Sequence, residues 1–550
     1  MVSEYGEKKS SIYLVPFLVL LAAYCIWILT LPLFPSLDGS LHLYYASVLG
    51  SLLAGSKDFA SYYFIRHILP PYALHYYFLI AVARLFGSVM ADKLLVCLIF
   101  ITTACGFRYL ARFLGPSGDM MSLFIIPLLL NWPLGMGFYN YCLAIGMALW
   151  ALGFWYRAVQ QRSHRLWVAF LITVILMVLT HPVPLLLIYV LVGVDVGWRF
   201  WRDFSNRGSG LLGLKASLYR FRSDLVYMLM AWVTIGYIFL FVDQQKVIAN
   251  VLQRYDRKAE LIKLFKLSTI AMFSGSSDVV LVYRLSLYAI LVVSLVLAGA
   301  AAKRQWSTGE YSPATAFLFC TGVLAIAIPM LPPVINGADY FSQRLVIFVW
   351  IGALAAASRF RAFNRRGTMI LATGIVFYSG AVLVLANSRI RPVATRIAEI
   401  ENSPIRNTGL VGLTLSLPNA PITTDLNYVP YYWVGARYFR RSRSILLNGG
   451  FLYEPYVPLG SHIAQLSPQL DAEIQNSPGN AYQLLLRSSR ARDQIMPHAN
   501  LLLFTGSTEP DELQKIITEL DSRETTRVWA CDSRGWYAVC TSPFSASVPH

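Results

Sequence analysis

The chain has 550 residues, of which 56% are hydrophobic and only 14% are charged, and its mean hydropathy is +0.53. A single water-soluble core cannot absorb this much apolar surface, so the composition excludes an ordinary soluble protein and predicts a polytopic α-helical membrane protein. The net charge of +17 does not indicate a nucleic-acid partner, because the basic residues gather in short segments between apolar runs.

The first long apolar run covers residues 11–31 and follows Lys8 and Lys9. A helix of this length can cross the hydrocarbon, because it satisfies every backbone N–H and C=O within the segment. The run ends at Pro32 rather than at a small-residue cleavage site. We therefore expect it to be retained as a span and not removed as a signal peptide.

Apolar runs recur through about residue 390. The candidate spans are residues 12–31, 71–87, 92–113, 119–136, 138–157, 166–181, 183–200, 225–242, 284–302, 313–333, 344–358 and 368–387. Basic residues cluster in residues 157–165, 199–222, 303–304 and 359–366, which the positive-inside rule assigns to cytoplasmic loops. If Lys8 and Lys9 lie inside and all twelve candidates cross, the tail is cytoplasmic, whereas the basic segment 359–366 places the tail outside after one more crossing. Residues 71–87 are the suspect segment, because they are short, begin at a Pro-Pro pair and carry His75 and Arg84. They could be re-entrant or lie beside the bilayer, or a further span could have been missed.

Counting back from a tail outside the cytoplasm, the outward-facing segments are residues 32–70, 135–141, 180–182, 243–283 and 332–343. Residues 1–387 are expected to form the multi-span module. The composition of residues 388–550 turns to Pro, Asn, Ser and mixed charge, which predicts a soluble extracytoplasmic α/β domain with a helix at 509–520 and strands at 527–530 and 536–540. No Asn-x-Ser/Thr sequon occurs, which favours a bacterial cytoplasmic membrane over the secretory pathway.

Five of the seven cysteines lie inside apolar runs, where a thiol usually acts as a small core hydrophobe. Cys531 and Cys540 flank residues 532–535, which look like a hairpin turn. The two could form a disulfide in an oxidising compartment, or remain free thiols on adjacent strands. The chain has no zinc-type Cys/His spacing, Walker loop or dinucleotide-binding glycine pattern, so soluble nucleotides are poor substrate candidates.

The acidic tripeptide Leu37-Asp38-Gly39 follows the first span and opens a polar segment at residues 38–45. A first span, an acid in a long first outer loop with a short amphipathic helix at 40–55, many further spans and a soluble outer tail together resemble the GT-C glycosyltransferases. The segments at 38–44, 137–140 (Gly-Phe-Tyr-Asn) and 180–182 (Thr-His-Pro) are also similar to a bacterial branch of that type. The resemblance covers the first 200 residues best.

The resemblance implies a GT-C fold and transfer of a sugar from a polyprenyl-phosphate donor to a glycan, lipid or protein acceptor at the outer membrane face. Such an enzyme needs a carboxylate beside the acceptor hydroxyl and cationic or metal help for the departing phosphate. Asp38 is the candidate for the first role by analogy with the first-loop carboxylate of the family. An Asp followed by Gly-Ser-Leu is equally suited to cap a helix that begins near Ser40, and the two roles are compatible.

Two further residues of the first loop are candidates for substrate binding. His42 lies one helical turn beyond Asp38 and could bind acceptor, phosphate or metal, or simply be an interfacial histidine. Asp58 is the other acid of this loop and could supply a second carboxylate, or pair at the surface with Lys57 or Arg66. A divalent metal such as Mg²⁺ or Mn²⁺ is therefore left open, with unknown ligands.

Arg344 is the candidate for the lipid phosphate, because a guanidinium at the outer edge of a span suits bidentate phosphate binding. Snorkelling to the headgroups is the alternative, and Arg66 and His67 are other choices for the phosphate. Polar residues also interrupt apolar stretches at two bends, namely Tyr139 with Asn140 and His181 before Pro182. They either make turns or contact sugar and acceptor in an outer cavity.

Two other functions fit parts of the pattern. A transporter or flippase would be expected to show internal repeats and ionisable residues near mid-membrane, whereas the polar residues here lie at outer ends. A lipid-linked polysaccharide ligase or polymerase would use basic residues in a large outer loop, and residues 243–283 contain several.

Overall fold

The computed structural model describes residues 11–57, 59–60, 63–207, 278–308, 312–331, 341–360 and 365–402, isolated positions between 215 and 272, and the elements of the tail given below. In these residues seven helices are long and apolar enough to cross a membrane. They cover Ile12–Thr30, Ser88–Leu114, Tyr139–Gln161, Pro182–Asn206, Leu281–Arg304, Pro313–Met330 and Arg366–Ala398. The chain is therefore a polytopic helical membrane protein, as its composition predicts.

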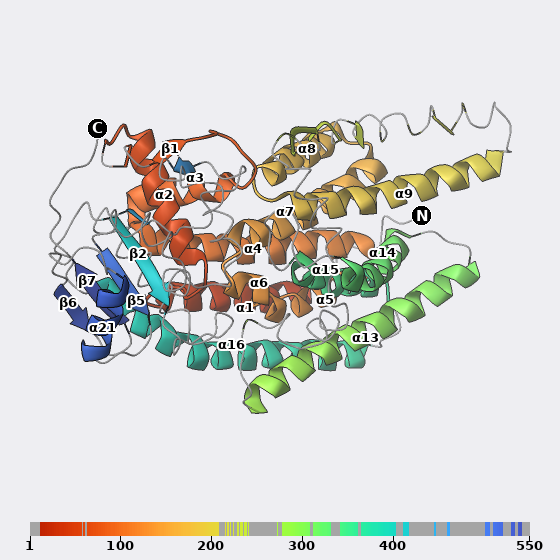
Figure 1. Cartoon of the computed structure of the whole chain (residues 1–550). Coiled ribbons are helices and arrows are strands. Elements are labelled where there is room, and N and C mark those ends of the chain that lie inside the picture. Colours follow the sequence, from red (N-terminus) through yellow and green to blue (C-terminus); the bar gives the residue numbers. More distant parts are fainter. Residues whose placement is uncertain are drawn as a thin grey trace. The chain divides into compact units, whose positions relative to one another are not determined.

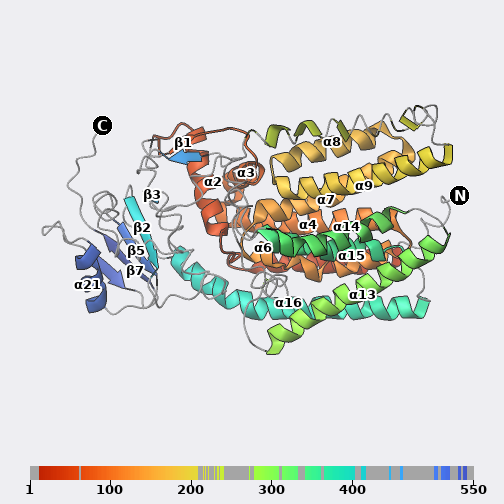
Figure 2. The ribbon, with the colours of Figure 1, turned by 45° about the vertical axis from the view of Figure 1, so that its right-hand side comes forward.

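Most of the expected spans are helices. The longest are α1 (Ser11–Thr30), α4 (Ser88–Leu114), α7 (Tyr139–Gln161), α9 (Pro182–Arg207), α13 (Asp278–Thr308) and α16 (Arg365–Asn402). Of these, α9, α13 and α16 extend further than predicted, and α16 continues 15 residues past the expected end at 387. α14 (Pro313–Ala327) continues into a 3₁₀ turn, η3 (Ile328–Met330). α7 packs against α9, and α14 packs against both α9 and α15 (Phe341–Ala357), so that these helices run side by side in Figures 1 and 2.

Three expected spans form shorter apolar helices, which are α3 (Leu74–Phe86), α8 (His164–Val178) and α15. The 13 residues of α3 extend for only about 20 Å, less than the roughly 30 Å of the hydrocarbon layer. The doubt about residues 71–87 therefore has a structural basis. The expected span at 225–242 lies largely outside the described residues.

The expected span at residues 119–136 is wrong, because no continuous helix forms there. The segment is broken into α5 (Gly118–Phe124), the 3₁₀ turn η1 (Pro127–Leu129) and α6 (Trp132–Gly135). Pro127 and Pro133 each lack the backbone N–H that a continuing helix needs. Between them Asn131 begins a new helix, since its side chain accepts a hydrogen bond from the Leu134 N–H at 3.0 Å.

The chain divides into two compact units. The first comprises residues 1–31, 71–75 and 93–389, and the second comprises residues 32–70, 76–92 and 390–550. The later boundary lies inside α16, which continues to Asn402. The first loop, which the sequence assigned to the membrane module, thus belongs to the same compact unit as the tail.

In the first unit α1 is tied to α16 and to α4 by polar contacts. The Tyr24 hydroxyl donates to the Ser379 carbonyl at 3.0 Å, and the Trp27 indole N–H donates to the Asn387 side chain at 3.1 Å. The buried Lys93 ammonium donates to the carbonyls of Leu29 and Leu31 at 2.9 and 3.0 Å. Lys93 thereby satisfies acceptors that the end of α1 leaves without intrahelical partners.

In the second unit α2 (Gly39–Leu53) is joined to a short strand, β1 (Tyr63–Ile65), through the hydroxyls of Tyr44 and Tyr63, which lie 3.1 Å apart. β1 pairs antiparallel with β4 (Leu459–Ser461) of the tail. Hydrogen-bonded strands must lie on the same side of a bilayer. The pairing therefore predicts that the first loop and the tail share one side of the membrane.

The tail contributes a five-stranded mixed sheet in the order β3-β2-β5-β7-β6. Its strands are β2 (Val411–Ser416), β3 (Ile445–Leu446), β5 (Leu501–Thr505), β6 (Ala530–Ser533) and β7 (Tyr537–Thr541), and α21 (Pro510–Leu520) lies beside them in Figures 1 and 2. The expected α/β character, the helix near 509–520 and the strand near 536–540 agree with these elements.

The predicted hairpin at residues 531–540 is present, although its strands extend further into the turn than expected. β6 and β7 pair antiparallel, with Cys531 directly opposite Cys540 in the register. Cys540 is buried and disulfide-bonded, whereas Cys25, Cys97, Cys105, Cys142 and Cys320 are free. Cys540 therefore does not remain a free thiol, which is the second of the two alternatives for this hairpin.

The pairing of β1 with β4 makes a testable prediction about topology. A compartment-sensitive reporter inserted beside the exposed Gly55 and one fused after His550 should report the same side, and the positive-inside rule predicts that this side is not cytoplasmic. A reporter inserted in the basic segment 359–366 is the control and should report the opposite side. Opposite signals from Gly55 and His550 would contradict the strand pairing.

Candidate functional site

Asp38 occupies the N-cap position of α2, but its carboxylate does not cap the helix. Its backbone is helical, with φ −85° and ψ −7°, and its side chain makes no capping hydrogen bond. A capping residue normally adopts an extended backbone so that its side chain reaches back to the first free N–H groups. The Asp38 side chain is nevertheless buried, with the residue 7% exposed. Of the two roles open from the sequence, capping is the one that Asp38 does not perform.

His42 and Tyr76 lie beside Asp38 in the second unit. The Nδ1 atom of His42 lies 3.2 Å from the Tyr76 hydroxyl, and the backbone N–H of His42 donates to the Asp38 carbonyl at 3.1 Å. The rings of His42 and Tyr76 are tilted against each other with centroids 5.6 Å apart. We call Asp38, His42 and Tyr76 the Asp38 cluster, and all three residues are buried.

The Asp38 cluster combines a carboxylate with a phenol that keeps its proton. Burial raises the pKa of the Tyr76 hydroxyl, and the nearby Asp38 charge raises this pKa further. Tyr76 is therefore protonated near neutral pH and can donate to Nδ1 of His42. The Asp38 carboxylate, which lies close to Tyr76 and His42, can accept a proton from the hydroxyl group of a bound substrate.

The other predicted residues of the first loop are less informative. Arg66 and His67 follow β1, where Arg66 is half-buried and His67 is exposed. Asp58 lies outside the described residues. Within the described residues no group of three or more His, Cys, Asp or Glu side chains could hold a metal ion.

A second group of side chains surrounds Arg344 in the first unit. The Arg344 guanidinium lies over the Phe138 ring, with its carbon 3.7 Å from the ring centroid. The Tyr141 hydroxyl donates to the Arg344 backbone carbonyl at 2.5 Å. A guanidinium placed on an aromatic face is held in a fixed plane while its N–H groups stay available at the edges.

His181 packs between two tyrosines of the same group. Its ring meets Tyr72 and Tyr141 edge-on, with centroids 4.7 and 5.0 Å away. Its Nδ1 accepts the Val183 backbone N–H at 3.2 Å, so the neutral ring carries its proton on Nε2. Burial, and then the Arg344 charge, hold the pKa of His181 well below its usual value. We call Tyr72, Phe138, Tyr141, His181 and Arg344 the Arg344 cluster.

Tyr72 holds an unusual backbone conformation in this cluster. Its φ is +71°, in the left-handed region that a bulky residue rarely adopts. Such strain persists only where the surrounding structure enforces it, and it is concentrated at functional sites.

Two segments that the sequence assigned to the outer face, 135–141 and 180–182, thus meet Arg344 in the Arg344 cluster, although not through every residue named in advance. Asn140 uses its side-chain oxygen to accept the Tyr141 backbone N–H at 2.8 Å, which is a turn-making role, and Tyr139 is fully buried. The contacts to His181 and Arg344 are made by Tyr141, the residue that follows Asn140.

Four polar atoms at or near the start of α15 are buried without a hydrogen-bond partner. They are His181 Nε2, Ser342 Oγ, Gln343 Oε1 and Arg344 Nε. Ser342 and Gln343 are only 1% and 6% exposed. Leaving one such group unpaired costs about 1–3 kcal/mol, so four in one region indicate a place where a polar ligand completes the hydrogen bonds.

Several of these residues were missed from the sequence. Tyr76 was missed because its partner His42 is 34 positions away, and Tyr72 because positive φ at a tyrosine has no local signal. Asp92 and Lys93 are both buried. The sequence contained a signal for these two residues. Two adjacent charged residues at the start of an apolar run cost free energy in a membrane and therefore indicate a specific role.

Comparisons with known proteins add little to this geometry. No protein-family model matches the chain, and no curated protein matches it. Among solved structures, that of ArnT from Cupriavidus metallidurans bound to undecaprenyl phosphate is similar, with a TM-score of 0.48 and 14% sequence identity over 98% of this chain and 100% of that chain.

The Tyr141 hydroxyl should stabilise the Arg344 cluster measurably. Tyr141→Phe keeps the ring contacts but removes the hydrogen bond to the Arg344 carbonyl, so we expect a loss of about 1 kcal/mol in the free energy of unfolding. Thermal unfolding of the purified protein measures this. Tyr109→Phe is the control, because the Tyr109 contacts to Arg157 use its ring and its backbone carbonyl. An equal effect of both substitutions would contradict the role assigned to Tyr141.

Proposed function

We propose that this protein is a GT-C-type glycosyltransferase that moves a sugar from a polyprenyl-phosphate donor to an acceptor hydroxyl at the outer face of a bacterial cytoplasmic membrane. The acceptor oxygen attacks the anomeric carbon of the sugar while its proton passes to a carboxylate. The bond from that carbon to the phosphate oxygen breaks, and the lipid phosphate leaves with the bonding electrons. The chain must therefore supply a base and a phosphate-binding group.

The observation that carries the proposal is the state of Asp38. Its carboxylate is buried at the start of α2 and makes no capping hydrogen bond, although it occupies the capping position. Close to it, Nδ1 of His42 lies 3.2 Å from the Tyr76 hydroxyl, so two further polar side chains are gathered at this carboxylate. We assign Asp38 the role of the base, with His42 and Tyr76 orienting the acceptor beside it.

For the donor phosphate we assign Arg344. The Phe138 ring fixes the plane of its guanidinium, and its Nε–H is buried without an acceptor. A phosphate presents oxygens in the geometry that a guanidinium fork binds through two parallel hydrogen bonds. The unpaired Nε2–H of His181 and the Ser342 hydroxyl are further donors for the same anion, and Gln343 offers an acceptor for a sugar hydroxyl.

The remaining assignments follow from the same proposal. Arg66, His67, Tyr139 and Asn140 are secondary candidates for substrate contacts, and Asp58 is a candidate second carboxylate that would admit a divalent metal. Residues 1–387 form the membrane module in this proposal, and residues 388–550 form the extracytoplasmic domain. The identity of the acceptor, whether glycan, lipid or protein, is open.

Charged side chains without a partner inside the membrane would support the alternative function of a transporter. In the described part of the chain, Asp195 and Asp224 are buried, but the half-buried Arg199 pairs with both carboxylates, at 2.8 and 2.9 Å. An internally paired network of this kind is typical of structural ion pairs and does not favour a transport path.

Asp38→Asn should abolish sugar transfer while leaving the fold intact. The amide has nearly the same shape and breaks no capping bond, but it cannot accept a proton, so we expect a loss of about 100-fold or more in rate. The assay is transfer from a polyprenyl-phosphate-linked sugar by purified protein in membranes, with thermal unfolding as the check on folding. Asn387→Asp, which keeps an oxygen for the Trp27 indole, is a matched control and should stay active. A fully active Asp38→Asn protein would overturn the assignment.

Arg344→Lys should raise the donor concentration needed for half-maximal rate by about tenfold, because lysine keeps the charge but loses the guanidinium fork. Arg344→Ala should raise it further. Binding of undecaprenyl phosphate, which carries no sugar, should weaken in parallel. Arg84→Lys, at an exposed position in α3, is the control. Unchanged binding of undecaprenyl phosphate to Arg344→Ala would show that the phosphate site lies elsewhere, with Arg66 and His67 next to be tested.

A further inference from the structure

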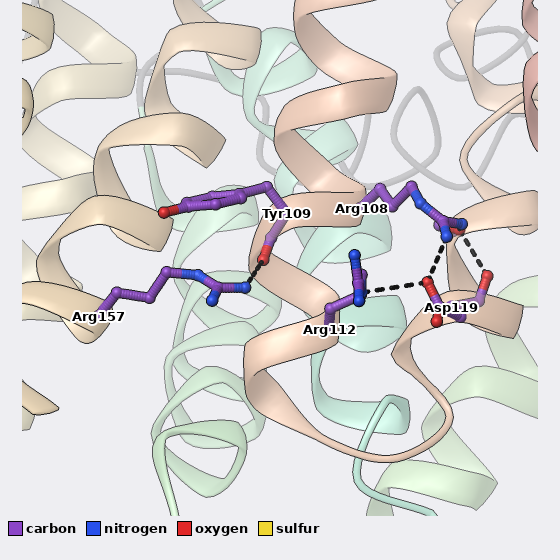
Figure 3. A network of polar contacts seen from close by, with 6 residues as sticks. Arg108, Tyr109, Arg112, Asp119 and Arg157 are labelled. Carbon is purple, nitrogen blue, oxygen red and sulfur yellow. Dashed lines mark hydrogen bonds and ion pairs between the residues drawn. The ribbon is translucent and has the colours of Figure 1, made fainter. Parts of the chain in front are cut away.

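Three arginines converge near the C-terminal ends of α4 and α7, in a region that the proposed reaction does not use. Arg108 and Arg112 belong to α4 and Arg157 belongs to α7, and Figure 3 shows them with Asp119 from the first turn of α5. We call Arg108, Arg112 and Arg157 the arginine cluster. Asp119 is the one carboxylate that the described residues bring into ion-pair distance of it.

Asp119 is committed mainly to Arg108. One Asp119 oxygen lies 2.6 Å from Nη2 of Arg108, whose Nη1 also donates to Ser122 at 3.1 Å. Arg112 reaches the same carboxylate oxygen only at 3.5 Å through its Nε. The turn between α4 and α5 fixes this arrangement, because a Cβ on Gly118 would lie 2.0 Å from the Ala111 carbonyl oxygen. The ion pair of Arg112 with Asp119 is therefore weak, because Arg108 already neutralises the Asp119 carboxylate.

Arg157 has no carboxylate partner within the described residues. Its guanidinium lies over the Tyr109 ring, 4.2 Å from the centroid, and its Nη2 donates to the Tyr109 carbonyl at 3.2 Å. Its Nε is buried without an acceptor. Arg112, near the C-terminal end of α4, belongs to the same end of the α4–α7 pair as Arg157. Two like charges held together in a partly desolvated place repel each other unless an anion lies with them.

The position of the arginine cluster identifies the anion. The turn after α4 meets the end of α15, where the Ser117 N–H donates to the Ser358 carbonyl at 3.0 Å. The ends of α4, α7 and α15 thus come together. The basic segment 157–165 covers the last turn of α7 and the residues after it, and the basic segment 359–366 follows α15. The positive-inside rule places this level at the cytoplasmic headgroup layer, where anionic phospholipids are found. The Arg112 side chain is 41% exposed and can reach them.

We propose that Arg112 and Arg157 bind the phosphate of an anionic phospholipid of the cytoplasmic leaflet. Its oxygens accept from the Arg112 guanidinium and from the unsatisfied Nε–H of Arg157, and its negative charge removes the repulsion between the two side chains. The lipid thereby joins the ends of α4 and α7. This site is independent of the proposed glycosyl transfer and would exist in a protein of any activity.

The test is the lipid dependence of stability and binding in the purified full-length protein. Delipidated protein is titrated with phosphatidylglycerol, with phosphatidylcholine or with inorganic phosphate, while thermal unfolding and lipid retention by native mass spectrometry are measured. We expect phosphatidylglycerol to stabilise the protein most. Arg112→Gln should require about fivefold more phosphatidylglycerol for the same effect, the equivalent of one lost contact to a lipid surface.

Controls separate this site from general surface charge. Arg165→Gln removes an exposed arginine of the same basic segment and should leave the phosphatidylglycerol response unchanged. If Arg112→Gln does not fold, Arg157→Lys serves instead, because it keeps the charge while losing the Nε–H, and the same weakening is expected. Equal phosphatidylglycerol dependence in the variant and the wild type would overturn the proposal. Equal stabilisation by inorganic phosphate would also overturn it, because the site would then bind a free anion.

Discussion

The fold depends on one constraint, which is that backbone polar groups within a bilayer must find partners inside the protein. The continuous helices meet it by themselves within each helix, and side chains provide partners at two of the places where a helix ends or begins. Lys93 satisfies the carbonyls of Leu29 and Leu31 at the end of α1, and Asn131 satisfies a free N–H of α6 while donating to the carbonyls of Leu128 and Leu129 at 3.0 and 3.3 Å. The Asn131 contacts supply three partners within the broken segment between α5 and α7.

Against that background the unpaired atoms near α15 are informative. The chain supplies partners at the end of α1 and the start of α6, yet His181 Nε2, Ser342 Oγ and Gln343 Oε1 stay unsatisfied, and the His181 ring is held between two tyrosine rings. A purely structural region would have replaced such groups with apolar ones at little cost. Their retention beside a stacked arginine and a tyrosine with positive φ is the pattern expected of a preorganised binding site, in which strain and unpaired groups serve a ligand.

Apolar run length and basic loops predicted most spans from the sequence, because both follow directly from bilayer thickness and insertion charge rules. The prediction of a span at 119–136 was wrong because Pro127 and Pro133 lie among strongly apolar residues. A hydropathy average therefore does not show that they interrupt the helix. The site was only partly predictable. Asp38, His181 and Arg344 stood out as polar residues at the ends of apolar runs, whereas Tyr141 and Tyr76 read as ordinary aromatic residues. Which of Tyr139, Asn140 and Tyr141 faces His181 depends on helix rotation of about 100° per residue, which packing sets.

The helix α15 explains how the Arg344 cluster can be rigid without a covalent link. Its first turn is tied through the Arg344 carbonyl to Tyr141, and the residue after its last turn, Ser358, accepts the Ser117 N–H. In its second half Gly352 lies so close to α14 that a Cβ would stand 2.0 Å from the Thr321 hydroxyl oxygen. Contacts at both ends and against α14 prevent the helix from sliding or rotating, because packed interfaces have few alternative registers. The Arg344 guanidinium is therefore presented from a helix whose register is already fixed before any ligand arrives, which lowers the entropy lost on binding.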